Sequence, residues 1–125
     1  MDGRATVLVA DDDADQRELL VELLGGEGYA PSGVGSPGAL LEALASPPDV
    51  LLLDLHGASS PEVEARLGAL GRRRPVLVLA SGAVDLPEHG ARLGADAVLQ
   101  KPFGLDELFA TVRQLLRART GPQPV

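Results

Sequence analysis

Four short apolar runs constrain the fold of this chain more than any other feature of its sequence. None of them alternates between apolar and polar residues, and each is bounded by residues that favour turns. Continuous runs of this kind are typical of strands buried on both faces of a parallel sheet, because neither face of the strand is left for solvent. The runs are TVLVA (6–10), DVLLLD (49–54), PVLVLAS (75–81) and DAVLQ (96–100).

The rest of the chain has helical periodicity, apart from a fifth, weaker strand expected over residues 29–34. Pro31 lacks the N–H that a central strand needs, so this strand is placed at an edge of the sheet. Leu19 in the first helix and Leu105 in the last are assigned to apolar stripes that face the core. Strands alternating with helices, five of each, predict an α/β domain with a parallel sheet wound on both sides. The expected helices are 14–28, 37–46, 61–71, 85–94 and 105–119.

The chain of 125 residues has the length of one domain, which we expect over residues 1–118, followed by a tail or linker start over 119–125. No apolar run approaches the ~20 residues of a membrane span, and the N-terminus lacks the features of a signal peptide. The chain has no cysteine, so disulfides and thiolate chemistry are excluded. These features favour a cytoplasmic protein with no membrane partner.

The net charge of −7 argues against a surface that binds nucleic acid directly, because phosphate binding requires a basic stripe. One basic cluster, Arg72 to Arg74, follows an apolar helical pattern, and we expect it to complement the C-terminus of a helix. The aromatic residues are too few to support base stacking; they are Tyr29, Phe103 and Phe109.

Polar residues follow the predicted strands at their carboxyl ends, where α/β sheets place their chemistry. Asp13 is expected to cap the first helix. The other carboxylates would repel one another if they met at one edge, so a cation must offset them. Oxygen ligands in a partly solvated site suit Mg²⁺. The polar residues at these ends are Asp11, Asp12 and Asp13 after the first strand, Asp54 and Ser81 at the ends of the third and fourth, and Lys101 after the fifth.

Lys101 is the one lysine among eleven basic residues and directly precedes Pro102. An ammonium and a guanidinium are not interchangeable, so its presence indicates a site that requires a compact positive charge; chance in an arginine-rich composition is the alternative. A carboxylate between a divalent cation and an ammonium is arranged to receive a phosphoryl group, since phosphoryl transfer depends mainly on position and charge neutralisation.

The order of the motifs VLVADDD, DVLLLDL, VLVLAS and VLQKPF resembles the receiver domain of two-component response regulators, over about residues 5–118. The resemblance implies a flavodoxin-like fold, with a doubly wound five-stranded parallel sheet of order 2-1-3-4-5 and five helices. It also implies a cis bond between Lys101 and Pro102. By this resemblance Asp54 would be the phosphoacceptor. The Mg²⁺ ligands would be Asp11, Asp12, Asp54 and the backbone carbonyl of His56. Ser81 would hydrogen-bond to the phosphoryl group, and Lys101 would pair with its charge.

The sequence departs from the family pattern at several positions. Ala58 replaces a proline, no Asp-Gly or Asn-Gly turn follows, and the segment up to the fourth strand is short, so the loop after the acceptor is expected to be atypical. Val98 replaces the family's switch aromatic, so the readout must go through packing or mobility of the fourth helix. His56 and Ala83 stand where relatives tune the lifetime of the phosphate, although His56 could equally be a solvated loop residue; His89 is assigned to the surface.

The resulting hypothesis is a phosphorylatable switch. A histidine kinase or phosphotransfer protein would donate a phosphoryl group to Asp54 with Mg²⁺, and the domain would catalyse only its own phosphorylation and dephosphorylation. The readout face would be the fourth helix, fifth strand and fifth helix, with an unknown output partner and a homodimer as one option. The alternative is a pseudo-receiver that binds proteins independently of phosphate. A flavin or nucleotide enzyme is disfavoured, because no glycine-rich loop follows the first strand.

Overall fold

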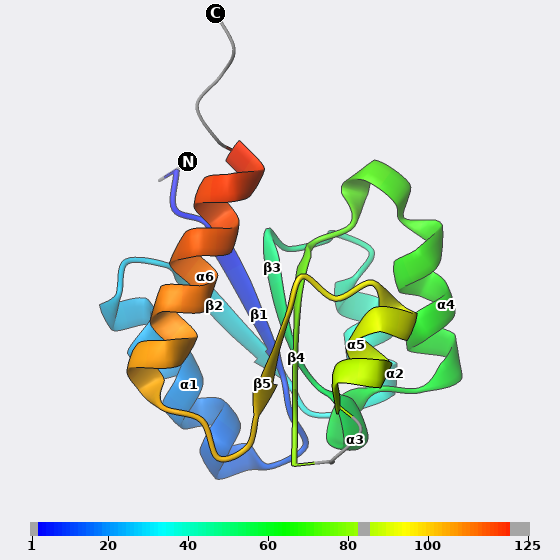
Figure 1. Cartoon of the computed structure of the whole chain (residues 1–125), viewed down its shortest axis with the longest axis horizontal. Helices are drawn as coiled ribbons and strands as arrows, with labels where there is room; N and C mark the ends of the chain where they lie inside the picture. Colours follow the sequence, from blue (N-terminus) through cyan, green and yellow to red (C-terminus); the bar gives the residue numbers. More distant parts are fainter. Residues whose placement is uncertain (1–2, 83–85, 121–125) are drawn as a thin grey trace, which may run out of the picture.

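The computed structural model describes residues 3–82 and 86–120. Its strands form one sheet in the order β2-β1-β3-β4-β5, and all four pairings are parallel (Figure 1). Both the parallel sheet and its predicted strand order are confirmed, and Pro31 lies in the edge strand β2 as expected. The strands are β1 (Thr6–Ala10), β2 (Ala30–Val34), β3 (Val50–Asp54), β4 (Val76–Ser81) and β5 (Ala97–Gln100).

The described residues form six α-helices, where the sequence predicted five. The additional helix, α3, is one turn that starts directly after β3, and four residues are too few to produce a recognisable periodicity. A 3₁₀ turn over Gly71–Arg73 ends the segment predicted as the third helix. The α-helices are α1 (Ala14–Gly26), α2 (Pro37–Ala43), α3 (Leu55–Ala58), α4 (Pro61–Ala69), α5 (Leu86–Leu93) and α6 (Leu105–Thr120).

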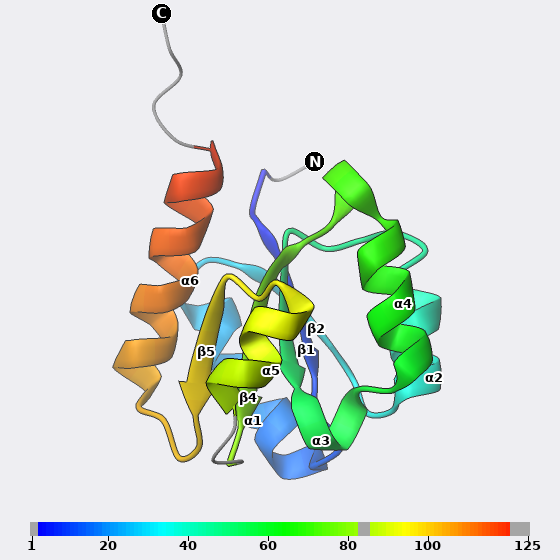
Figure 2. The same cartoon turned by 45° about the vertical axis from the view of Figure 1, so that its right-hand side comes forward.

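Two helical layers cover the sheet, as Figures 1 and 2 show. Helices α1 and α6 pack on one face, where Leu20, Leu24, Leu108 and Val112 are buried against the strands. Helices α2, α3, α4 and α5 cover the opposite face. The three central strands are therefore buried on both sides, which explains their uninterrupted apolar sequences.

Two residues assigned to the core from the sequence face solvent instead. Leu19 is 48% exposed and Leu105 is 40% exposed. Both lie beside core-facing positions of their helices, at the margin of the buried stripe, where helical spacing alone does not separate core from surface. None of the described helices combines the length and apolar character needed to span a membrane.

Candidate functional site

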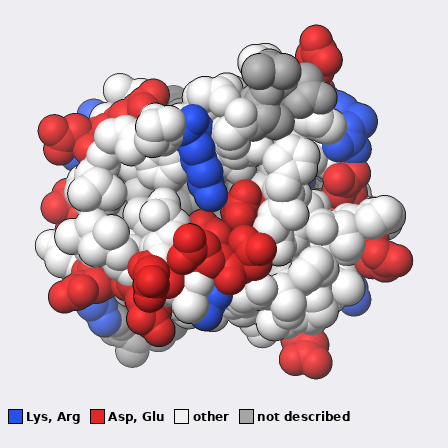
Figure 3. Space-filling model, turned by 90° about the horizontal axis from the view of Figure 1, so that it is seen from below, with Lys and Arg blue, Asp and Glu red and all other residues white. Residues whose placement is uncertain are grey.

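The carboxyl ends of four strands converge on an acidic hollow at one edge of the sheet. Carboxylate oxygens of Asp11, Asp12 and Asp54 lie within 4.8 Å of one another. Figure 3 shows this face, with acidic side chains gathered near its centre and a basic side chain next to them. Asp11 and Asp12 follow β1 and Asp54 ends β3, and because these strands are parallel neighbours their ends meet at the same edge.

Asp11 is held in a fixed orientation at the base of the hollow. It is 3% exposed, and its Oδ1 accepts a hydrogen bond from the backbone N–H of Asp13 at 3.0 Å. The backbone carbonyl of Asp11 accepts a hydrogen bond from Arg17 Nη1 at 2.8 Å. Asp13 in turn caps α1, as predicted, by accepting a hydrogen bond from the N–H of Gln16. One carboxylate oxygen of Asp11 therefore remains for the hollow.

Lys101 points into the hollow between two carboxylates. Its Nζ lies 3.5 Å from Asp11 Oδ2 and 3.6 Å from Asp54 Oδ1, with the lysine side chain 30% exposed. The backbone N–H of Lys101 donates to the carbonyl of Ser81 at 2.8 Å, which joins the ends of β4 and β5. The bond between Lys101 and Pro102 is cis, as the family resemblance implied.

The electrostatics of the hollow are dominated by excess negative charge. Burial raises the pKa of the Asp54 carboxyl group above its ordinary value; Lys101 lowers it, and the charge of Asp11, a side-chain hydrogen bond with Asp11 and the charge of Asp12 raise it. The raising effects prevail. A single ammonium thus does not balance the three carboxylates, and a further cation would be stabilised here.

The two carboxylate oxygens of Asp54 face different neighbours. Oδ1 lies by the Lys101 ammonium, whereas Oδ2 lies on the side of Asp12 and Gly57. A Cβ atom built on Gly57 would be 2.1 Å from Asp12 Oδ1 and 2.3 Å from Asp54 Oδ2. Gly57 was not predicted as a site residue from the sequence. Its position three residues after Asp54 is the signal that could have identified it. The hard oxygen donors, and a space beside them that a side chain would fill, fit Mg²⁺.

The remaining predicted residues are Ser81, His56, His89 and Ala83. Ser81, at the end of β4, is 1% exposed. His56 is exposed on α3, and its ring meets the ring of His89 on α5 edge to face, with centroids 6.2 Å apart. His89 was assigned to the surface but is half-buried, and its Nδ1 lies 3.0 Å from Arg92 Nη2. Ala83 lies outside the described residues.

Val98 contacts α5 from the neighbouring strand. It is 36% exposed, and a Cβ atom built on Gly90 of α5 would lie 2.6 Å from Val98 Cγ1. Gly90 thus lets the helix approach the strand closely at the position to which the family resemblance assigns a switch aromatic.

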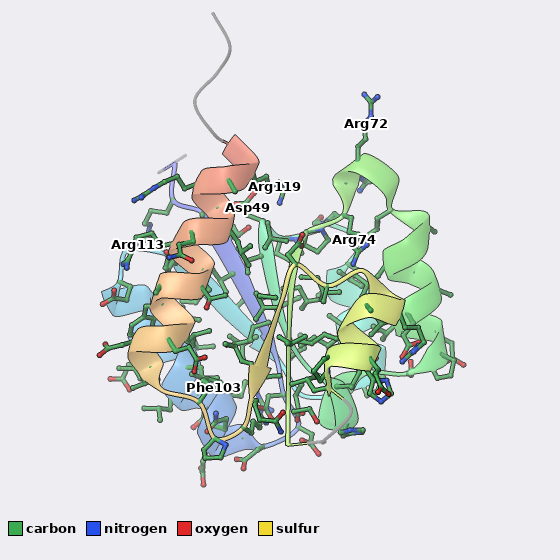
Figure 4. All side chains as sticks on the ribbon, viewed as in Figure 1. Asp49, Arg72, Arg74, Phe103, Arg113 and Arg119 are labelled. Atoms are coloured by element: carbon green, nitrogen blue, oxygen red, sulfur yellow. The ribbon has the colours of Figure 1, made fainter. Side chains whose placement is uncertain are left out.

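The opposite, amino edge of the sheet carries a second group of charged residues (Figure 4). The Asp49 carboxylate accepts hydrogen bonds from the Thr6 N–H at 2.8 Å and the Thr6 hydroxyl at 3.1 Å. Arg119 Nη1 donates to the Asp49 carbonyl at 2.7 Å. Arg74 Nη2 donates to the carbonyls of Leu93 and Gly94, at 2.6 and 2.7 Å. Of the predicted arginine cluster, Arg74 does complement a helix C-terminus, but that of α5 rather than of the helix preceding it.

The chain is similar to proteins of one signalling family. The model of the response regulator receiver domain matches residues 7–113. Response regulator MprA of Mycobacterium avium (strain 104) is 40% identical over 121 residues, which are 94% of this chain and 53% of that protein. The chain thus spans about half the length of this relative.

Solved structures show the same fold. A response regulator receiver protein from Burkholderia phymatum has a TM-score of 0.78 at 26% identity, covering 98% of this chain and 100% of that one. Response regulator TrrA from Thermotoga maritima, determined in complex with Mg²⁺-BeF, has a TM-score of 0.72 at 25% identity, covering 89% and 98%. Together with the family model and the relative at 40% identity, these likenesses show that the chain belongs to the receiver domain family of two-component response regulators.

Proposed function

We propose that Asp54 accepts a phosphoryl group from the phosphohistidine of a histidine kinase or phosphotransfer protein. A carboxylate oxygen of Asp54 attacks the phosphorus atom, the new P–O bond forms as the P–N bond to the donor imidazole breaks, and the imidazole leaves with the electron pair of that bond. The single observation that carries this proposal is the position of the Lys101 ammonium, 3.6 Å from Asp54 Oδ1 and 3.5 Å from Asp11 Oδ2. There it can pair with the charge of the incoming phosphoryl group.

The proposal includes Mg²⁺ as the second cation. Asp11, Asp12, Asp54 and the backbone carbonyl of His56 would hold it, and when bound it would supply charge neutralisation for the phosphoryl oxygens. The raised pKa of Asp54 supports a requirement for additional positive charge in the hollow. The structure of TrrA in complex with Mg²⁺-BeF, a relative at 25% identity, supports the same assignment.

The residues of the chain would act by position and charge. Lys101 would neutralise the charge of the phosphoryl group, and Asp11 would hold Lys101 in place through the contact of its Oδ2. Ser81 would donate a hydrogen bond to a phosphoryl oxygen. The domain thus catalyses only its own modification and its reversal. We take the domain to run to the end of α6 at Thr120, two residues beyond the boundary expected from the sequence, because Arg119 of that helix donates to the Asp49 carbonyl.

The phosphoryl dianion would then shift a two-state surface, as charge-adding modifications do. By family likeness the readout face comprises α5, β5 and α6, and it would contact an output domain or partner that the residues do not identify. Val98 replaces the switch aromatic, so the readout must take another form. The close contact of Gly90 with Val98 favours a movement of α5 against β5. The exchange would take place in the cytoplasm.

The test is intact-mass measurement after incubation with acetyl phosphate and Mg²⁺. We expect the parent to gain one phosphoryl group and an Asp54→Asn variant to gain none. Equal labelling of both would place the acceptor elsewhere.

The atypical loop after Asp54 keeps the pseudo-receiver as a second candidate. Mg²⁺-dependent binding of beryllofluoride, with NMR shifts around Ser81 and α5, is expected for the phosphorylatable switch. An unchanged spectrum, together with an unlabelled parent, would favour the phosphate-independent module.

A further inference from the structure

The turn α3 places the backbone of Gly57 directly against the acidic hollow. Asp54 is the N-cap residue of α3, with φ −74° and ψ 108°, yet its side chain makes no capping hydrogen bond. The carboxylate is turned into the hollow instead of toward the helix. Because the helix begins at once, the third residue after the acceptor already lies over the space between Asp12 and Asp54.

Backbone conformation does not explain a glycine at this position. Among the described residues, the glycines with positive φ are Gly3, Gly28, Gly71 and Gly94, and Gly57 is not one of them. Alanine could adopt the same helical backbone and would favour the helix more strongly than glycine does. A Cβ atom at residue 57 would instead overlap the carboxylates of Asp12 and Asp54 in their present positions, so a side chain there would displace them.

That space lies at metal-ligand distance from two carboxylates. A Cβ atom on Gly57 would be 2.1 Å from Asp12 Oδ1 and 2.3 Å from Asp54 Oδ2. Mg²⁺ binds oxygen ligands at about 2.0–2.1 Å, so a methyl group would take part of the volume that an ion shared by these carboxylates needs. A carboxylate of Asp54 displaced by that methyl group would also change its contact with the Lys101 ammonium, which lies 3.6 Å from its Oδ1.

We propose that Gly57 is a positioning residue that keeps the space between Asp12 and Asp54 open for a divalent cation. This inference rests on the proposed function, in which those two carboxylates hold Mg²⁺. It makes a specific claim about the atypical loop: with α3 placed directly after the acceptor, the third residue of that helix must lack a side chain if the domain is to bind the ion and accept a phosphoryl group.

The experiment compares Gly57→Ala with Gly68→Ala. Gly68 also lies in a helix, α4, but a Cβ atom there would have nothing within 4 Å, so this variant is the matched control. Mg²⁺ binding is measured by isothermal titration calorimetry with the metal alone, and the helical content by circular dichroism. We expect Gly57→Ala to bind Mg²⁺ at least tenfold more weakly than the parent, and Gly68→Ala to bind it as the parent does. Parent-like affinity in Gly57→Ala overturns the inference.

A second variant keeps the inference testable if Gly57→Ala does not fold. In a background that carries Asp12→Ala and Asp54→Ala both clashing carboxylates are gone, so Gly57→Ala should fold there and lower the melting temperature less than it does in the parent. A combined variant that stays unfolded, or an equal loss in both backgrounds, contradicts the proposed clash. A parent that neither binds Mg²⁺ nor accepts a phosphoryl group refutes the proposed function itself, whereas a labelled parent with an equally competent Gly57→Ala refutes only the role of Gly57.

Discussion

The two edges of the sheet use charged residues in opposite ways. At the amino edge, the carboxylate of Asp49 is hydrogen-bonded to the N–H and hydroxyl of Thr6, and Arg74 and Arg119 donate to backbone carbonyls. At the carboxyl edge, Asp11, Asp12 and Asp54 lie within 4.8 Å of one another around one ammonium. The charged groups of the amino edge form hydrogen bonds with backbone groups, whereas those of the carboxyl edge interact mainly with one another.

This difference separates stability from function within one domain. Hydrogen bonds from the backbone N–H and the hydroxyl of Thr6 compensate the Asp49 carboxylate for the water it loses, so the amino edge adds to the free energy of unfolding. The raised pKa of Asp54 indicates that the carboxyl edge reduces it instead. Such a cost is expected where a site is arranged for an incoming charged group.

The largest effect is expected from removing the one cation of the carboxyl edge. Lys101→Met should slow labelling by acetyl phosphate about 100-fold, comparable to the loss of one fixed donor that neutralises charge in a reaction. Lys101→Arg is the matched control, because it keeps the charge but not the compact ammonium, and should recover only part of the rate. Labelling is followed by intact mass against time. A Met variant that is labelled at the parent's rate would show that the Lys101 contact is structural.

The next largest effect is expected at the amino edge. Asp49→Ala removes a charged acceptor from the Thr6 N–H and hydroxyl and should lower the free energy of unfolding by about 2 kcal/mol. Urea unfolding measures this loss. Labelling of the folded variant with acetyl phosphate should stay at the parent's rate, since the two edges do not share residues. A coupled loss of labelling would break the separation of the two edges.

A smaller effect, of opposite sign, is expected at Asp54. Asp54→Asn removes one of the repelling charges and should raise the free energy of unfolding by about 1 kcal/mol at neutral pH.

Because the pKa of Asp54 is higher in the folded than in the unfolded state, the folded state binds this proton more tightly. The parent therefore loses stability as pH rises from the unfolded-state pKa through the folded-state pKa. The advantage of the variant should be full above that window and vanish below it; thermal unfolding at several pH values measures it. A variant less stable than the parent at neutral pH would contradict the excess of negative charge.

The smallest effect is expected for a charge pair that belongs to neither edge. Arg92 Nη1 lies 2.5 Å from Glu64 Oε1, with the arginine side chain 51% exposed. Exposed pairs of this kind contribute little, so Glu64→Gln should leave the midpoint of urea unfolding close to that of the parent. A loss as large as that of Asp49→Ala would mean that charge pairs between helices matter as much as the amino edge.

The strands and the principal site residues could be predicted from the sequence because their signals are local. Each apolar run corresponds to a strand within one residue at either end, and parallel pairing alone brings Asp11, Asp54 and Lys101 to one edge. The helix α3 could not be predicted, since one turn has no periodicity. The role of Gly57 depends on that turn, and the partner of Arg74 lies about twenty positions away in the sequence, at the end of α5. Both are tertiary relationships.

The contact between His56 and His89 has a practical consequence. The chain contains two histidines, and they meet across the gap between α3 and α5. One follows Asp54 by two residues, and the other belongs to the helix on the proposed readout face. Their imidazole NMR resonances can therefore serve as a pair of reporters. A change at Asp54 could be observed on α5 without attaching any label.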